Sequence, residues 1–170
     1  MKEPQMRIFT IGYEGADILD FIETLDTLKI SRVIDIRDVP ASRRRDFSKN
    51  ILRDHLEQAG IFYSHFKALG DPKEGRDAMR AGNKEIFLKI FGDHIQKLEA
   101  QKALDEVTEI ALDETSILLC YERDYKDCHR LIVATELRRR GEFTVQHVGV
   151  RKDASKERIA GNGAVALPAF

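Results

Sequence analysis

The sequence lacks any long apolar run, and no stretch approaches the roughly 20 residues that a membrane-spanning helix requires. Its first residues, Met1 to Gln5, contain no apolar segment of the kind found in signal peptides. We therefore expect a cytoplasmic protein with no membrane partner.

The sequence also contains few cysteines and has almost no net charge. The only cysteines among the 170 residues are Cys120 and Cys128, and a structural disulfide between them is not expected in a reducing compartment. The formal net charge is −1, so no overall basic field attracts nucleic acid or an anionic membrane. Any anion must then be bound by a local cluster. The sequence assigns no cofactor and no oligomeric state.

What is present is typical of a folded globular chain. Apolar residues make up 42% of the sequence and charged residues 34%, which argues against a disordered protein. A length of 170 residues suits a single domain. We expect one domain over residues 1–170, with its core at about 7–149 and a C-terminal tail at 151–170 that is loosely ordered from Ala154.

Segments typical of strands and of helices alternate along the chain. This alternation predicts an α/β fold: a mostly parallel sheet of about five strands with helices on both faces. Residues 67–83 are predicted to form a long polar loop, either functional or mobile. The predicted strands are 7–12, 32–36, 61–66, 116–120 and 143–148, and the predicted helices are 17–28, 48–59, 83–112 (broken near Gly92 or Ala100) and 127–141, capped by Asp17, Ser48, Asn83 and Asp127.

In such sheets, ligands bind outside the carboxyl ends of the strands. Tyr13 follows the first predicted strand and is placed to line a pocket. Asp35 and Arg37 are two positions apart at the end of the second predicted strand, so their side chains point to the same face. A buried carboxylate needs a partner, and the guanidinium of Arg37 can be that partner. Their pair has two interpretations: an ion pair that closes the strand, or a guanidinium held in place and aimed at a ligand.

Three consecutive arginines, Arg43 to Arg45, follow the second predicted strand. Guanidinium groups above a strand end can bind phosphate or carboxylate through forked hydrogen bonds. A solvated charged surface is the alternative.

The segment from Cys120 to Arg130 combines the most chemistry. If Asp127 caps a helix, Cys128, His129 and Arg130 occupy its first turn, where free amides and the helix dipole favour an anion or a thiolate. Glu122 lies at the end of the preceding strand. Cys120, inside that strand, is assigned to packing.

Taken together, these motifs resemble the domain of unknown function 488 family, in order over about residues 7 to 149. The resemblance implies a single α/β domain and marks the same strand ends, and it implies no reaction. The matching motifs are Thr10-Ile11-Gly12-Tyr13, Asp35-Ile36-Arg37-Asp38-Val39-Pro40 with Ser42-Arg43, Phe47-Ser48-Lys49, Leu69-Gly70, and Leu119-Cys120-Tyr121-Glu122 with Cys128-His129-Arg130.

The first functional hypothesis is an enzyme that acts on a small anionic molecule, phosphorylated or nucleotide-like. Arginines would hold the anion, Glu122 or His129 would move a proton, and Cys128 would be a nucleophile or redox thiol. Phosphatases and sulfurtransferases usually place a phosphate-binding loop after the cysteine, whereas here the loop precedes Cys128. The predicted ligand-binding residues are Tyr13, Asp35, Arg37, Arg43 and Arg130, and the predicted catalytic residues are Cys128, His129 and Glu122.

Three alternatives stay open. One is a nucleotide or nucleic-acid binding module without catalysis. Another is a metal site built from Cys120, Cys128 and His129 with His65 or His147, although no Cys-x-x-Cys pair supports it. The last is a scaffold whose polar strand ends only close the fold.

Overall fold

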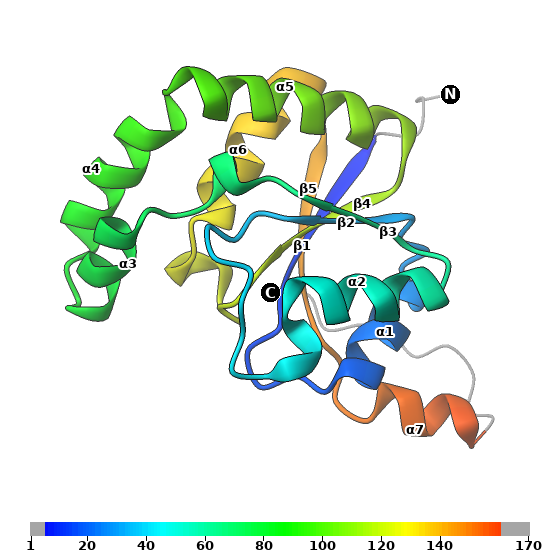
Figure 1. Cartoon of the computed structure of the whole chain (residues 1–170). Coiled ribbons are helices and arrows are strands. Elements are labelled where there is room, and N and C mark those ends of the chain that lie inside the picture. The colour runs from blue at the N-terminus through cyan, green and yellow to red at the C-terminus, as the bar shows by residue number, and fades with distance from the viewer. Residues whose placement is uncertain (1–5, 161–170) are drawn as a thin grey trace.

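The computed structural model describes residues 6–160 and contains one five-stranded sheet in which every strand pairing is parallel. The strand order is β3-β2-β4-β1-β5, which places β4 at the centre (Figure 1). The α/β fold with a parallel sheet of five strands is therefore confirmed. The strands are β1 (Arg7–Gly12), β2 (Arg32–Asp35), β3 (Phe62–His65), β4 (Ser116–Cys120) and β5 (Thr144–Gly149).

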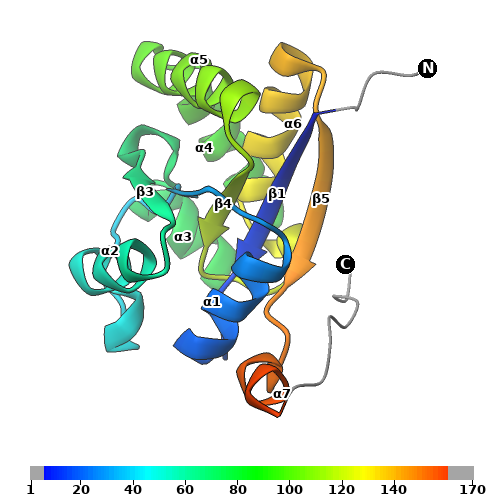
Figure 2. The same ribbon diagram turned by 90° about the vertical axis from the view of Figure 1, so that its right-hand side faces the viewer.

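Helices cover both faces of the sheet (Figure 1). Successive residues of a strand point to opposite faces, so Ile8 packs in one apolar cluster and Phe9 in the other. Figure 2 shows α7 following β5 and lying beside α1. The first face carries α4 (Lys84–Ile95), α5 (Leu98–Asp113) and α6 (Arg130–Gly141), and the second carries α1 (Ile18–Thr27) and α2 (Lys49–Gln58), with α7 (Ala154–Ile159) packed against α1.

Two of the four predicted helix caps are confirmed. The side chain of Asp17 accepts hydrogen bonds from the amides of Leu19 and Asp20, and that of Asn83 accepts one from Ile86. Ser48 stands at the start of α2, but its hydroxyl bonds to the backbone of Ser42 instead.

The Asp127 cap is wrong. Asp127 ends the short 3-10 helix η3 (Tyr125–Asp127), and α6 begins only at Arg130, with His129 at its N-cap position. Cys128 and His129 therefore precede the helix rather than fill its first turn. The predicted effect of the helix dipole on the Cys128 thiol assumed a position in the first turn, which Cys128 does not occupy.

The segment 67–83 is not a loop, because it forms the 3-10 helix η2 (Lys67–Leu69) and helix α3 (Lys73–Arg80), which packs against α4. The long helical region breaks at Gln96 and Lys97 rather than at Gly92 or Ala100.

The tail also contains more structure than predicted. Helix α7 is anchored by Asp20, whose carboxylate accepts hydrogen bonds from the amides of Asp153 and Ser155. The Gly161-Asn162-Gly163 segment lies outside the described residues.

Strands β1 and β4 are neighbours whose following helices leave toward opposite faces, α1 to one and α6 to the other. Such a switch point opens a crevice outside the carboxyl ends of the two strands, where ligands bind in parallel sheets. Within residues 6–160, no helix combines the length and apolar character needed to cross a membrane.

Candidate functional site

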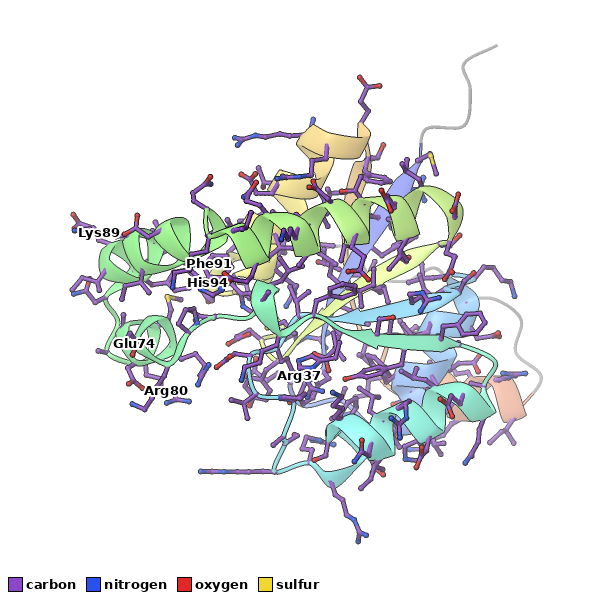
Figure 3. All side chains as sticks on the ribbon, turned by 45° about the horizontal axis from the view of Figure 1, so that its top comes forward. Arg37, Glu74, Arg80, Lys89, Phe91 and His94 are labelled. Atoms are coloured by element: carbon purple, nitrogen blue, oxygen red, sulfur yellow. The ribbon has the colours of Figure 1, made fainter. Side chains whose placement is uncertain are left out.

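A cavity of about 810 Å³ lies at the carboxyl ends of β1, β2 and β4. Its walls come from these strand ends, from the arginine loop that follows β2 and from the α3–α4 pair. Figure 3 shows Arg37 near the end of β2, with Arg80 on α3 and Phe91 on α4 on the same side of the molecule. The volume suits a drug-sized or nucleotide-sized molecule.

Cys120, Cys128 and His129 form a buried group at this cavity, which we call the thiol–imidazole cluster. The Nδ1 atom of His129 lies 3.6 Å from the sulfur of Cys120 and 3.8 Å from the sulfur of Cys128. All three atoms lie within 4.8 Å of one another. Cys120 ends β4, and the other two residues precede α6, so the fold brings together groups eight and nine positions apart.

The orientation of His129 is fixed by the neighbouring strand. Its Nε2 atom lies 2.8 Å from the carbonyl oxygen of Ile36, just beyond β2, and a carbonyl only accepts hydrogen bonds. Nε2 therefore carries a proton, and in a neutral ring Nδ1 presents its lone pair to the two sulfurs. Phe91 packs edge-on against the ring at 5.2 Å between centroids.

Burial and mutual contact shift the titration of the cluster. Burial alone raises the pKa of the Cys120 thiol, but hydrogen bonding from Cys128 and the charge of His129 lower that pKa well below its usual value. Burial and the hydrogen bond to Cys120 raise the pKa of Cys128. Burial lowers the pKa of His129, and the charge of Cys120 outweighs it and raises that pKa to about 9. Cys120 rather than Cys128 is thus favoured as the thiolate.

Glu122 adds a carboxyl group beside the cluster. Its Oε2 atom lies 3.0 Å from the sulfur of Cys120, within hydrogen-bonding distance. Burial, followed by the charge of Cys120, raises the pKa of Glu122 to about 7. The predicted acid or base therefore lies next to a thiol whose pKa is lowered.

Arg37 and Asp35 form the predicted buried ion pair. The Nε and Nη2 atoms of Arg37 donate to the two oxygens of Asp35 at 2.9 and 2.6 Å, while Nη1 donates to the hydroxyl of Tyr13 and the carbonyl of Phe47. Burial alone lowers the pKa of Arg37, and the hydrogen bonds and charge of Asp35 raise it above its usual value. Arg37 lines the cavity, and Asp35 stands behind it as the partner that orients it.

Two candidate site residues, Asp71 just before α3 and Arg76 within it, were missed because residues 67–83 were predicted to be a loop. Asp71 lines the cavity, and its buried Oδ1 atom has no hydrogen-bond partner within the described chain. Burial raises the pKa of Asp71 to about 6, against the lowering effect of His129 and Arg76. Nη1 of Arg76 donates a hydrogen bond to the carboxylate of Asp38 at 2.8 Å, and both residues line the cavity. The Leu69-Gly70 motif directly precedes Asp71 and is the sequence signal that could have indicated this part of the site.

Arg43 and Arg44 border the cavity from the loop after β2 and are exposed. Across residues 6–160, neither guanidinium group has a hydrogen-bond or ion-pair partner, which sets both apart from Arg37 and Arg76. Two unpaired guanidinium groups at a cavity edge are suited to an anion.

Arg130 has a different placement. It is completely buried and does not line the cavity. Its guanidinium donates to the hydroxyl of Thr10 at 3.2 Å, to the carbonyl of Arg123 at 3.0 Å, and to the carbonyl of Glu122. The structure therefore uses Arg130 to join the ends of β1 and β4.

The structure brings six of the eight predicted site residues to one cavity. Asp35 and Arg130 lie behind it, and Cys120, which was assigned to packing, belongs to the cluster. Among the described residues, His65 and His147 are not part of the one group whose donor atoms converge closely enough to hold a metal ion. The six are Tyr13, Arg37, Arg43, Glu122, Cys128 and His129.

The chain was compared with known families, curated proteins and solved structures. A family model described as "Domain of unknown function DUF488" matches residues 17–137. No curated protein and no solved structure matches the chain. The matched region contains β2 to β4, most of α6 and the whole thiol–imidazole cluster.

Proposed function

The chain belongs to the family of the domain of unknown function DUF488, and from its site we propose an enzyme that binds a small phosphorylated or nucleotide-like anion and acts on it at the thiol–imidazole cluster. The observation that carries the proposal is the shared cavity. Unpaired arginines border it, and two thiols, an imidazole and a carboxyl group line the same space.

Binding would begin with the exposed arginines. Arg43 and Arg44 are free to form forked, charge-assisted hydrogen bonds to phosphate oxygens. Arg37 offers a fixed positive charge deeper in the wall, held by Asp35 and next to Tyr13. Tyr13 and Tyr121 meet edge-on at 5.3 Å between ring centroids and supply an aromatic border for a base or another flat group.

The reacting part of the ligand would then face the cluster. Its groups are buried, so water is largely excluded and their electrostatic interactions are strengthened. Glu122 provides a carboxyl group in contact with Cys120 and lines the same cavity. This placement supports proton transfer to or from a bound substrate.

Anion binding is tested by calorimetric titration with AMP, ADP and inorganic pyrophosphate, and with neutral adenosine as the uncharged comparison. We expect binding of the phosphorylated compounds only. Changing Arg43→Ala together with Arg44→Ala should weaken it at least about tenfold, because each charge-assisted bond is worth about 1.5–3 kcal/mol. Arg53→Ala, in α2 and outside the cavity lining, is the control. Tighter binding of a single-stranded oligonucleotide than of any mononucleotide would favour a nucleic-acid module instead.

Catalysis is tested by incubating the protein, purified without chelator, with a set of phosphorylated metabolites and measuring their depletion by mass spectrometry. We expect depletion with the native protein and with Arg53→Ala, and none with Cys120→Ser. If every compound survives while phosphate binding is intact, the protein is a binding module and the proposed enzyme activity is refuted.

A further inference from the structure

The thiol–imidazole cluster has the donor atoms and the spacing of a metal centre. Three ligand atoms converge from two segments: the sulfurs of Cys120 and Cys128, and Nδ1 of His129. All three residues are at least nine-tenths buried, and all three line the cavity. Soft sulfur with imidazole nitrogen is a donor set that selects zinc among the common divalent ions.

The distances agree with one tetrahedral ion. Typical Zn–S and Zn–N bonds of about 2.3 and 2.0–2.1 Å put sulfur and nitrogen about 3.5 Å apart on the edge of a tetrahedron, and two sulfurs about 3.8 Å apart. The observed sulfur-to-nitrogen distances are 3.6 and 3.8 Å, and the sulfurs lie within 4.8 Å of each other. The two sulfur-to-nitrogen distances therefore already suit a tetrahedral ion, and the upper bound on the sulfur-to-sulfur distance is compatible with the 3.8 Å that such an ion needs.

The surroundings of the three donors point the same way. Histidines that bind a metal usually donate their other ring N–H to a carbonyl or carboxylate, which orients the free nitrogen. His129 does this through Nε2 to the carbonyl of Ile36. The amide of Arg130 lies 3.5 Å from the sulfur of Cys128 and donates to it, which stabilises a thiolate that binds a metal.

Glu122 is not one of the three residues whose ligand atoms converge. A carboxylate oxygen and a thiolate on one tetrahedral zinc would lie about 3.6 Å apart. Oε2 of Glu122 is only 3.0 Å from the sulfur of Cys120, which is a hydrogen-bond contact. Three protein ligands leave a fourth position, and the cavity that all three line is the space into which it opens.

We infer that Cys120, Cys128 and His129 bind one zinc ion whose fourth coordination position faces the cavity. Zinc with three protein ligands and an open position is typical of catalytic rather than structural sites, and it supplies a Lewis acid. The use of that position in catalysis rests on the proposed function, whereas the binding of zinc does not.

The first experiment uses the native protein alone. The protein is stripped with a chelator, reduced, and titrated with zinc against a competing indicator, and its two thiols are then alkylated with and without zinc. We expect one zinc per chain and protection of both thiols. Failure to bind a stoichiometric zinc, or binding that leaves both thiols as reactive as before, overturns the inference.

The second experiment assigns the ligands. Cobalt(II) is added to the stripped protein, because a tetrahedral thiolate site gives visible ligand-field bands and a near-ultraviolet thiolate-to-cobalt band. We expect Cys120→Ser, Cys128→Ser and His129→Ala to weaken zinc binding at least about 100-fold, since ligand loss should exceed the 10–100-fold cost of losing an outer-shell contact. His65→Ala removes a histidine whose ring bonds to the carbonyl oxygen of Arg37, outside the three proposed ligands, and this variant should bind zinc normally. Unchanged spectra in all three variants would refute the assignment, and circular dichroism confirms that each variant is folded.

The two proposals fail separately. Zinc binding without any affinity for phosphorylated compounds would leave a metal site and remove the proposed substrate. Phosphate binding by a protein that never takes up zinc would leave the anion site and remove the metal.

Discussion

His129 donates a hydrogen bond from Nε2 to the carbonyl oxygen of Ile36, 2.8 Å away, and this contact fixes the direction in which the other ring nitrogen points. Ile36 directly follows β2, whereas His129 precedes α6, so the pairing of β2 with β4 sets the ring's position. Nδ1 then faces two sulfurs that come from β4 and from the turn before α6. The chemistry of the cluster is thus a product of strand order, which no local motif contains.

The first prediction concerns the two ion pairs of β2. Asp35→Asn removes the counter-charge of Arg37, whose side chain is only 6% exposed, and should lower the free energy of unfolding by about 3 kcal/mol. Glu114→Gln removes the partner of Arg32 near the other end of the strand, where both side chains are partly exposed, and should cost less than about 1 kcal/mol. Urea denaturation in the presence of a chelator measures both. Equal losses would show that the Asp35–Arg37 pair has no special structural weight.

The second prediction tests the structural role of Arg130. Its guanidinium reaches three acceptors, and a lysine ammonium cannot occupy all three positions. Arg130→Lys should therefore lower the free energy of unfolding by about 2–4 kcal/mol, because buried carbonyl groups lose their donors. Arg138→Lys, at an exposed position of the same helix, should change it by less than about 0.5 kcal/mol. Similar thermal midpoints for the two variants would contradict this role.

The sequence predicts a helix or strand of this fold only where the buried side of that element gives a regular spacing of apolar residues. The strands were found because their apolar, β-branched runs end at turns, and α1 because Asp17 caps a periodic segment. Helix α3 was missed because Lys73–Arg80 is mostly charged, contains Gly75, and packs only its Ala78 and Met79 against the core. With so few apolar contacts, its pattern resembles that of a polar loop.

The candidate site shows a different limit. The sequence indicates Glu122, Cys128 and His129 because they stand close together at a strand end. It cannot distinguish a 3-10 turn from the first turn of a helix, which is why the Asp127 cap was wrong. Cys120 was assigned to packing because a cysteine in a buried strand usually only packs. Its role depends on contacts with a residue nine positions later, which only the fold supplies.

The third prediction concerns Gly12 at the end of β1. A Cβ atom added there would lie 1.8 Å from the carbonyl oxygen of Glu122, and backbone cannot move aside as a flexible side chain can. Gly12→Ala should lower the free energy of unfolding by about 2–3 kcal/mol, as overpacking does in a tight interior. Gly92→Ala, in α4 with open space around the added atom, should stabilise the protein by up to about 1 kcal/mol. The prediction fails if both substitutions shift the urea midpoint in the same direction.

The fourth prediction is a pH dependence from His147, which lies on β5 and is not part of the thiol–imidazole cluster. Its Nδ1 atom is 2.6 Å from the hydroxyl oxygen of Thr10, and its ring stacks on Tyr125 with centroids 3.7 Å apart. Burial, and then the positive charge of Arg130, lower the pKa of His147 to about 4. The folded protein therefore holds this ring neutral over a range in which an unfolded chain protonates it.

The sign of the effect follows from proton uptake. Between the unfolded pKa of about 6.5 and the folded pKa of about 4, the unfolded chain binds more protons at His147 than the folded chain does, so stability falls as the pH falls through this window. Allowing for partial solvent access, we expect this residue to account for roughly 2 kcal/mol of the loss between pH 7 and pH 4.

His147→Phe keeps a ring against Tyr125 but cannot take up a proton. Its loss of stability over that range, measured by urea denaturation with chelator present, should be smaller than that of the native protein by this amount. His55→Phe, at a partly exposed position on α2, should not reduce the loss. If the native protein and His147→Phe lose the same stability on acidification, His147 is protonated in the folded state, and the inferred influence of Arg130 on it is wrong.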